Sequence, residues 1–275
     1  MDEYQSFAEF AKGTVVGAME ILREHQSHFT VTNQKDIMDV ATDADLASEK
    51  YIIDRIHAAY PDHGIHSEEA GDSLPDAEFR WIIDPLDSTK EYVRGLEDFA
   101  VLLALEKRGE LIVGAIAGFP LGTVYHAWKG GGAYKNGVRM TVAKTDDLQH
   151  AFVATHIPNG HTNSSETIDQ SLALVKAINA ASYRCRINWV TAKLCVWVAR
   201  GGVDAMILPE CAVHWHDIAP GLLIASEAGA KVTDWYGSMP TLESTDKGFI
   251  IAPEPLYSPL WDIAVTLRSH TPPTS

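Results

Sequence analysis

The chain has 275 residues, 46% of them hydrophobic and 21% charged, and a formal net charge of −15 at pH 7. This composition is that of a globular protein, and the acidic balance argues against nucleic-acid polymers and anionic membranes as partners, since phosphates bind basic surfaces. The three cysteines fit neither a disulfide framework nor a zinc site. The cysteines therefore indicate a reducing compartment. Asp2 and Glu3 follow Met1 with no apolar segment after them, and no apolar run approaches the length of a membrane span, so we expect no signal peptide, no membrane span and a cytoplasmic location.

Two amphipathic helices are expected before the first main strand. Residues 3–26 carry apolar side chains at helical spacing. Residues 39–45 open a second helix, which continues to about Tyr60 before a Pro-Asp-His-Gly breaker. A short strand at 64–69 ends in two acids, and a loop is expected at 70–78.

The central stretch, residues 81–92, has the pattern of a buried strand, a turn and the first turn of a helix. Residues 98–128 then predict a β-meander with turns at Gly and Pro residues. The Asn-Gly pair at 136–137 is a hairpin signal.

Strands and helices alternate through the second half, which predicts an α/β layer. A soft boundary near residue 146 separates the two halves, 1–146 and 147–275, and the tail 271–275 is expected to be disordered. The strands of the second half are expected at 151–156, 183–187, 203–208, 231–234 and 248–252, and its helices at 165–180, 190–201, 216–229 and 256–268.

Two aspartates three residues apart follow the apolar run of the central stretch. Pro85 keeps Asp84 extended, so Asp84 and Asp87 can converge at the carboxyl end of the strand. Ser88 and Thr89 then lie where a helix start offers N–H groups to an anion. Two carboxylates beside such a site suit a hard cation that carries a phosphate. The alternative is a strand, a turn and a capping aspartate.

Acidic residues stand at four predicted element ends, where side chains can converge without lying inside an element. Gathered carboxylates repel one another unless cations lie among them, so the set predicts a site for two or three Mg²⁺ ions. The alternative is that each acid is an independent cap or solvated side chain. The four positions are Asp45, Glu68 with Glu69, Asp84 with Asp87, and Asp217.

The acidic positions belong to four longer blocks, which are Asp39…Asp45-x-x-x-Glu49, Ser67-Glu68-Glu69, Trp81-Ile82-Ile83-Asp84-Pro85-Leu86-Asp87-x-Thr89 and His216-Asp217-Ile218-Ala219…Glu227-Ala228-Gly229. The spacing of these blocks resembles the inositol monophosphatase family over about residues 5–265. The resemblance implies a layered αβαβα sandwich, of α+β or α/β class, often a homodimer. It also implies a Mg²⁺-dependent, lithium-sensitive phosphomonoesterase.

The resemblance implies a set of metal ligands. Glu68, Asp84 and the Leu86 carbonyl would hold a first Mg²⁺. Asp84 would bridge to a second, which Asp87 and Asp217 complete. Glu68 would serve a weaker third ion, partly through water, and it is counted among the catalytic residues. Such ions lower the pKa of bound water and create a nucleophile near neutral pH.

The resemblance also implies residues that act on water and substrate. Asp45 and Thr89 would orient and activate the attacking water, and Asp45 would accept its proton directly or through Thr89. The amides of Ser88 and Thr89 would bind phosphate. Glu210 matches a position that contacts substrate hydroxyls, and Lys90 could reach a second phosphate. The alternative for Lys90 is an exposed lysine in the first turn of a helix.

This chain departs from the family pattern at two positions. Ser88 replaces the usual glycine, and its side chain can restrict the backbone beside the phosphate. His216 replaces a frequent tryptophan. His214 and His216 could form a transition-metal pair, although the carboxylates already supply a Mg²⁺ site. Cys195 lies in a predicted helix and is expected to be a core residue.

The substrate stays open within the class of small phosphorylated metabolites. Residues 89–92 look more like the 3′(2′),5′-bisphosphate nucleotidase and histidinol-phosphatase branches. Against a nucleotide, the loop at 157–162 shows no basic or aromatic clamp, and Glu210 favours a polyol such as inositol monophosphate. A further alternative is a catalytically weak relative that binds a metabolite or a protein, with Ser88 as the lesion.

Overall fold

The protein is described here by a computed structural model. No helix of the described chain is long and apolar enough to cross a membrane. The residues that the structure describes are 2–34, 40–158, 160, 163–188 and 190–269.

The chain folds into two compact units, and the second begins at Met140. The first unit comprises Met1–Arg139 and Ala219–Ile224, and the second comprises Met140–Ile218 and Ala225–Ser275. A single boundary near residue 146 does not anticipate that a short later segment belongs to the first unit.

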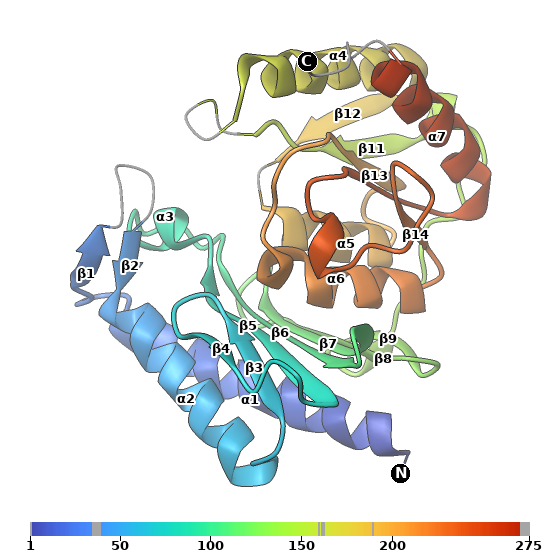
Figure 1. Cartoon of the computed structure of the whole chain (residues 1–275). Coiled ribbons are helices and arrows are strands. Elements are labelled where there is room, and N and C mark those ends of the chain that lie inside the picture. Colours follow the sequence, from blue (N-terminus) through green and yellow to red (C-terminus); the bar gives the residue numbers. More distant parts are fainter. Residues whose placement is uncertain (1, 35–39, 159, 161–162, 189, 270–275) are drawn as a thin grey trace. The chain divides into compact units, whose positions relative to one another are not determined.

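An eight-stranded sheet forms the centre of the first unit, in the order β10-β9-β8-β7-β6-β5-β3-β4 (Figure 1). β3 and β5 are parallel, whereas the pairs from β5 to β10 are antiparallel. The predicted meander is confirmed, and the loop expected at 70–78 contains the short strand β4. The strands are β3 (Gly64–Ser67), β4 (Gly71–Ser73), β5 (Phe79–Asp87), β6 (Ala100–Lys107), β7 (Glu110–Gly118), β8 (Val124–Trp128), β9 (Gly132–Lys135) and β10 (Val138–Arg139).

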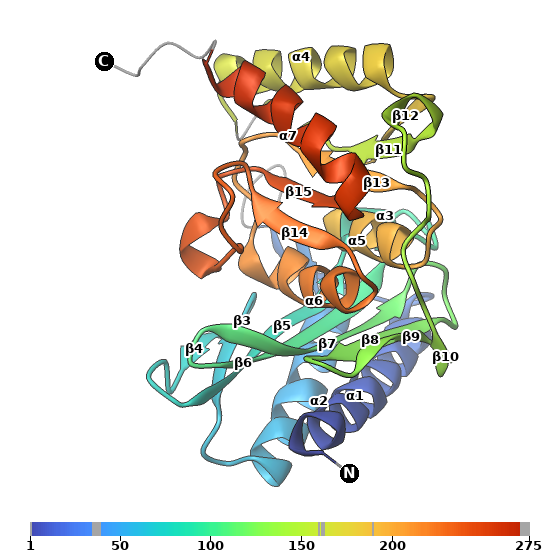
Figure 2. The same ribbon diagram turned by 90° about the vertical axis from the view of Figure 1, so that its right-hand side faces the viewer.

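Helix α1 (Glu3–His25) packs against β6, β7 and β8, and α2 (Asp43–Ala59) packs against β5 (Figure 2). The buried face of α1 repeats every three or four residues, as the sequence predicts. Its small alanines let the helix approach the sheet, where burial of each large apolar side chain contributes about 1.5–3 kcal/mol. The fully buried residues of this layer include Ala8, Ala11, Val15, Ala18, Leu22, Trp81, Ile83, Val101 and Leu103.

Helix α2 begins at Asp43, with Thr42 as its N-cap. The sequence places the opening of this helix at residues 39–45, and Asp39 lies outside the described residues. A two-stranded sheet, β1 (Val31–Gln34) and β2 (Val40–Thr42), leads into the helix. The Thr42 side chain accepts a hydrogen bond from Ala44 N–H, which satisfies one of the free amides at the helix start.

The second unit has a five-stranded sheet in the order β12-β11-β13-β15-β14. β11 is parallel to β12 and β13, and the other pairs are antiparallel. The predicted alternation of strands and helices is confirmed throughout. The elements are β11 (Phe152–Thr155), α4 (Ser165–Ala181), β12 (Arg184–Ile187), α5 (Thr191–Ala199), β13 (Ala205–Leu208), α6 (Trp215–Glu227), β14 (Lys231–Asp234), β15 (Phe249–Ala252) and α7 (Glu254–Ser269).

The middle of α6 belongs to the first unit, where it meets β7. A Cβ added to Gly114 of β7 would lie 2.6 Å from the backbone oxygen of Pro220. Such an approach is too close for any side chain at this position, so the contact between strand and helix requires glycine.

Candidate active site

Glu68 and Asp84 follow neighbouring positions of two parallel strands. Ser67, the last residue of β3, pairs with Ile83 of β5. Glu68 and Asp84 come next on each strand, and the Glu68 N–H donates to the Ile83 carbonyl at 3.2 Å. Because the two strands are parallel and in this register, Glu68 lies beside Asp84 where β3 ends, while β5 continues to Asp87.

The turn expected after Asp84 is instead a bulge within β5. The register between β5 and β6 shifts between Asp84 and Asp87, where β5 holds one extra residue. Asp84 is buried, and its Oδ1 accepts from the Leu86 N–H at 3.0 Å. The Ser48 hydroxyl of α2 donates to the Pro85 carbonyl at 2.8 Å. The bulge therefore brings two aspartates of one strand to the same edge.

Helix α3 (Thr89–Tyr92) is a single helical turn, at the position where the sequence predicts the first turn of a helix. Ser88 precedes it in the left-handed region, with φ 71° and ψ 47°. The Thr89 hydroxyl lies 3.0 Å from the Leu86 carbonyl oxygen and 3.2 Å from Asp45 Oδ1. Having one proton, it donates to one of these acceptors at a time.

Asp45 caps helix α2 and also contacts Thr89. Its Oδ2 accepts from the Thr42 N–H at 2.8 Å and from the Thr42 hydroxyl at 2.5 Å, which forms a capping box. Its Oδ1 faces Thr89. Burial raises the pKa of the Asp45 carboxyl, and the hydrogen bonds from Thr42 and Thr89 oppose that shift. Asp45 is thus a helix cap and a hydrogen-bond acceptor for Thr89, and its role in proton transfer stays a prediction.

Glu49 is a supporting residue to which the sequence analysis assigned no role. It is buried, and its Oε1 accepts from the Ser67 hydroxyl at 2.5 Å and from the Ala70 N–H at 2.9 Å. These bonds hold the turn that carries Glu68. The available signal was its position four residues after Asp45, on the same face of α2.

Asp217 lies in the first turn of α6, in the second unit. His216 Nε2 lies 3.3 Å from Asp217 Oδ1, and the His214 and His216 rings stack at 5.1 Å. Burial raises the pKa of the Asp217 carboxyl, and His214 opposes the shift. A nearby cation would favour the ionised carboxylate.

Glu210, also in the second unit, is held at both carboxylate oxygens. Gln170 of α4 donates to Oε2 at 2.9 Å, and the Tyr236 hydroxyl donates to Oε1 at 2.6 Å. The hydrogen bond to Glu210 raises the pKa of Tyr236, so Tyr236 stays a donor at neutral pH. Both bonds fix the orientation of a carboxylate that the sequence assigned to substrate hydroxyls.

The donor set of the first unit suits Mg²⁺ chemically. Glu68, Asp84, Asp87 and the Leu86 carbonyl offer only oxygen, which Mg²⁺ prefers. Within the described residues, however, no three His, Cys, Asp or Glu side chains are grouped so that they could hold a metal. The expected convergence with Asp217 stays a prediction.

Other predicted candidates separate into core and surface. Cys195 is fully buried in α5, and burial raises its pKa to about 12, which confirms a core residue rather than a nucleophile. Lys90 is exposed, and its contact with a second phosphate stays a prediction. The predicted absence of a base clamp at 157–162 concerns a loop in which residues 159, 161 and 162 lie outside the described residues.

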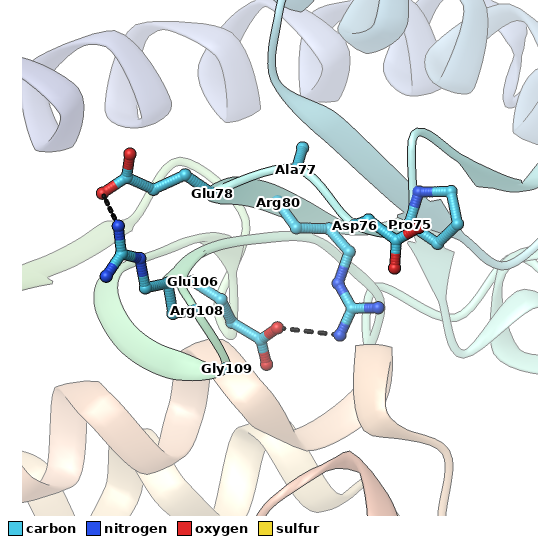
Figure 3. A pocket seen from close by; sticks show the side chains of 8 residues that line it. All are labelled: Pro75, Asp76, Ala77, Glu78, Arg80, Glu106, Arg108 and Gly109. Atoms are coloured by element: carbon cyan, nitrogen blue, oxygen red, sulfur yellow. Dashed lines mark hydrogen bonds and ion pairs between the residues drawn. The ribbon is translucent and has the colours of Figure 1, made fainter.

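A pocket of about 410 Å³ lies at the opposite end of β5 (Figure 3). Arg80 Nη2 pairs with Glu106 Oε2 at 3.0 Å, and Arg108 Nη2 with Glu78 Oε1 at 3.4 Å. Arg80 precedes Asp87 by seven strand positions, or roughly 23 Å. This pocket is therefore separate from the carboxylate edge.

Comparison with known proteins shows the family of this chain. The model of the inositol monophosphatase family matches residues 3–266. A Vibrio cholerae protein called Nus factor SuhB is 36% identical over 225 residues, covering 82% of this chain and 81% of that protein. A fructose-1,6-bisphosphatase/inositol-1-monophosphatase of Aquifex aeolicus is 34% identical over 237 residues, covering 85% and 87%.

A solved structure supports the fold. The extragenic suppressor protein suhB of Bartonella henselae superposes with a TM-score of 0.83 at 26% identity, covering 94% of this chain and 98% of that one. The predicted layered sandwich of the inositol monophosphatase type is thereby confirmed. The family includes phosphatases, although the factor name of some relatives leaves a non-catalytic role open. By sequence match and by fold, this chain belongs to the inositol monophosphatase family.

Proposed function

We propose that this protein is a Mg²⁺-dependent phosphomonoesterase that hydrolyses a small phosphorylated metabolite by in-line attack of water. The observation that carries the proposal is the placement of Glu68 and Asp84 side by side, each directly after the last pair, Ser67 and Ile83, of the parallel strands β3 and β5. Asp87 follows the bulge of β5, and Thr89, two residues later, contacts Asp45 of α2. A purely structural cap at Asp45 would not need Thr89.

The proposed metal ligands are the carboxylates of Glu68, Asp84, Asp87 and Asp217 and the Leu86 carbonyl, for two or three ions. Bound Mg²⁺ would neutralise phosphate charge and lower the pKa of the attacking water. The chain itself orients these ligands: the Leu86 amide fixes Asp84 Oδ1 at 3.0 Å.

Proton transfer is assigned to Thr89 and Asp45. The Thr89 hydroxyl lies 3.2 Å from Asp45 Oδ1, so it can take a proton from the attacking water while it donates its own to Asp45. The raised pKa of Asp45 makes it a stronger acceptor than an exposed aspartate. The amides of Ser88 and Thr89 are the proposed phosphate donors.

The preferred substrate is an inositol monophosphate-like ester. Gln170 and Tyr236 hold Glu210 as a fixed acceptor, which suits a leaving group rich in hydroxyls. A 3′(2′),5′-bisphosphate nucleotide, which Lys90 could help to bind, and histidinol phosphate are the alternatives. The fructose-1,6-bisphosphatase/inositol-1-monophosphatase name of the Aquifex relative also favours a polyol or sugar ester.

A second candidate is a catalytically weak binding protein. It is favoured by the Nus factor name of the Vibrio relative and by the left-handed backbone of Ser88. The net charge of −15 favours a small metabolite or a protein over a nucleic acid as partner, and that expectation stays a prediction. We also propose a cytoplasmic homodimer.

The test is phosphate release from a panel of esters, each measured with Mg²⁺ and with EDTA. The panel comprises inositol 1-phosphate, fructose 1,6-bisphosphate, 3′-phosphoadenosine 5′-phosphate, histidinol phosphate and a nucleoside monophosphate. Release that EDTA abolishes would support the phosphatase and identify its branch. A folded protein that binds Mg²⁺ but releases no phosphate from any ester would favour the binding protein.

A further inference from the structure

Ser88 holds a backbone conformation that serine rarely adopts. Its φ of 71° and ψ of 47° lie in the left-handed region, where a Cβ meets the following carbonyl oxygen and glycine is favoured. Strained residues of this kind persist where the surrounding structure fixes them, and they gather at functional sites.

Hydrogen bonds on both sides fix the Ser88 backbone. The Ser88 carbonyl accepts from the Glu91 N–H at 3.0 Å and from the Tyr92 N–H at 3.1 Å. On the other side, β5 is paired with β6 up to Asp87. The chain must therefore pass from strand to helical turn within one residue, and the left-handed conformation of Ser88 makes that change of direction.

The Ser88 side chain returns toward the strand end. Its Oγ donates to Asp87 Oδ1 at 3.2 Å, longer than the usual 2.7–2.8 Å for such a bond. Glycine at this position would adopt the backbone without strain but would lack the hydroxyl. Alanine would keep the Cβ and the strain and would also lack the hydroxyl. The two substitutions therefore separate the contribution of the hydroxyl from that of the backbone.

We propose that Ser88 is a positioning residue for Asp87: its strained backbone aims a hydroxyl that orients the Asp87 carboxylate for a divalent cation. This inference rests on the proposed function, because it takes Asp87 as a Mg²⁺ ligand. Ser88 in this view is not a lesion. The strain at Ser88 lowers the stability of the metal-free protein, while its hydroxyl orients the Asp87 carboxylate before a cation binds.

The test is Mg²⁺ titration by calorimetry, together with thermal unfolding of the metal-free protein. Ser88→Ala and Ser88→Gly should both raise the Mg²⁺ dissociation constant by about fivefold, the scale of one lost hydrogen bond. Ser88→Gly should also raise the Tm by about 2 °C as strain is released. Ser88→Ala should not raise it.

Leu74→Gly is the matched control. Leu74 is also a non-glycine residue at positive φ, 45°, in the first unit, and the site does not use it. Its replacement should raise the Tm and leave Mg²⁺ affinity unchanged. Equal Mg²⁺ affinity in the wild type, Ser88→Ala and Ser88→Gly would overturn the inference while the proposed function stands. Absence of Mg²⁺ binding by the folded wild type would overturn both.

Discussion

The two ends of β5 both carry charged side chains, and they differ in how the charge is balanced. At the amino end, arginines meet glutamates: Arg80 with Glu106, and Arg108 with Glu78 (Figure 3). At the carboxyl end, the donors to Asp84 and Asp87 include the amide of Leu86 and the hydroxyl of Ser88. Neutral donors orient a carboxylate without offsetting its charge. At the first end the arginines offset the charge of the glutamates. At the second end these two donors orient the aspartates, which we propose as ligands of bound cations.

Removing a proposed metal ligand at the carboxyl end of β5 should have the largest effect on activity. Asp84→Asn should lower Mg²⁺-dependent kcat/KM by at least about 1,000-fold, because the proposed bridging ligand loses its charge. The far-UV circular dichroism and the Tm should stay near wild type. Normal turnover in this variant would contradict the assignment of Asp84 to the metal.

Loss of the proposed proton relay between Thr89 and Asp45 should have the next largest effect on activity. Thr89→Val removes the hydroxyl that lies between Asp45 Oδ1 and the Leu86 carbonyl, and it should lower kcat by roughly 100-fold, the usual share of a general base. Thr89→Ser keeps the hydroxyl and should recover most of the rate. If valine and serine variants performed equally, the relay would be wrong.

A substitution at the ion-paired amino end of β5 should lower the stability of the protein and leave its activity unchanged. Glu106 is 2% exposed and pairs with Arg80, which is 18% exposed. Glu106→Gln should reduce the free energy of unfolding by roughly 2 kcal/mol, because a largely buried guanidinium loses its countercharge. Denaturant unfolding measures this loss. The activity per folded molecule should not change, and a loss of kcat would show that the two ends are coupled.

The smallest effect concerns pH and His63, near the amino end of β3. His63 accepts from Trp81 Nε1–H at 3.1 Å and stacks with Tyr60 and Phe79. Burial lowers its pKa, and Asp62 and Glu3 oppose that shift.

Because the folded-state pKa of His63 lies below the unfolded value of about 6.5, the unfolded chain binds the proton first. The contribution of neutral His63 to the free energy of unfolding is complete above about pH 6.5. It is lost as the pH falls through the lowered pKa of the folded state. Between pH 7.5 and 5, His63→Gln should lose less stability than wild type, by under about 1 kcal/mol. If denaturant unfolding gave the same pH dependence for the wild type and His63→Gln, His63 would not contribute to the pH dependence of stability.

The sequence predicts the order of elements well because periodicity is a local property. In α1, apolar residues recur every three or four positions and specify a helix. Between β9 and β10, the Asn-Gly pair specifies a turn. The same locality limits the prediction. Strand β4 has a polar, exposed sequence, so it forms because β3 offers an edge to pair with.

The candidate site likewise has features that the sequence predicts and features that depend on distant segments. Acids near element ends were visible in the sequence. Glu68 does follow β3 directly, whereas Asp84 lies within β5, beside it, where the pairing with β3 stops. The support from Glu49 to the turn after β3 was not visible, because it joins residues about twenty positions apart. Nor was the bulge between Asp84 and Asp87, because a change of register depends on the partner strand β6.

The sequence by itself determined the family, the types of donor and the sites of the turns, because these follow from residue identity and short spacing. The tertiary structure decided which residues orient the candidate metal-binding and catalytic side chains. It showed that Asp45 caps α2 while it faces Thr89, and that Ser88 occupies a glycine conformation with its hydroxyl on Asp87. The physical reason is that orientation comes from hydrogen bonds between distant segments, which no local pattern encodes.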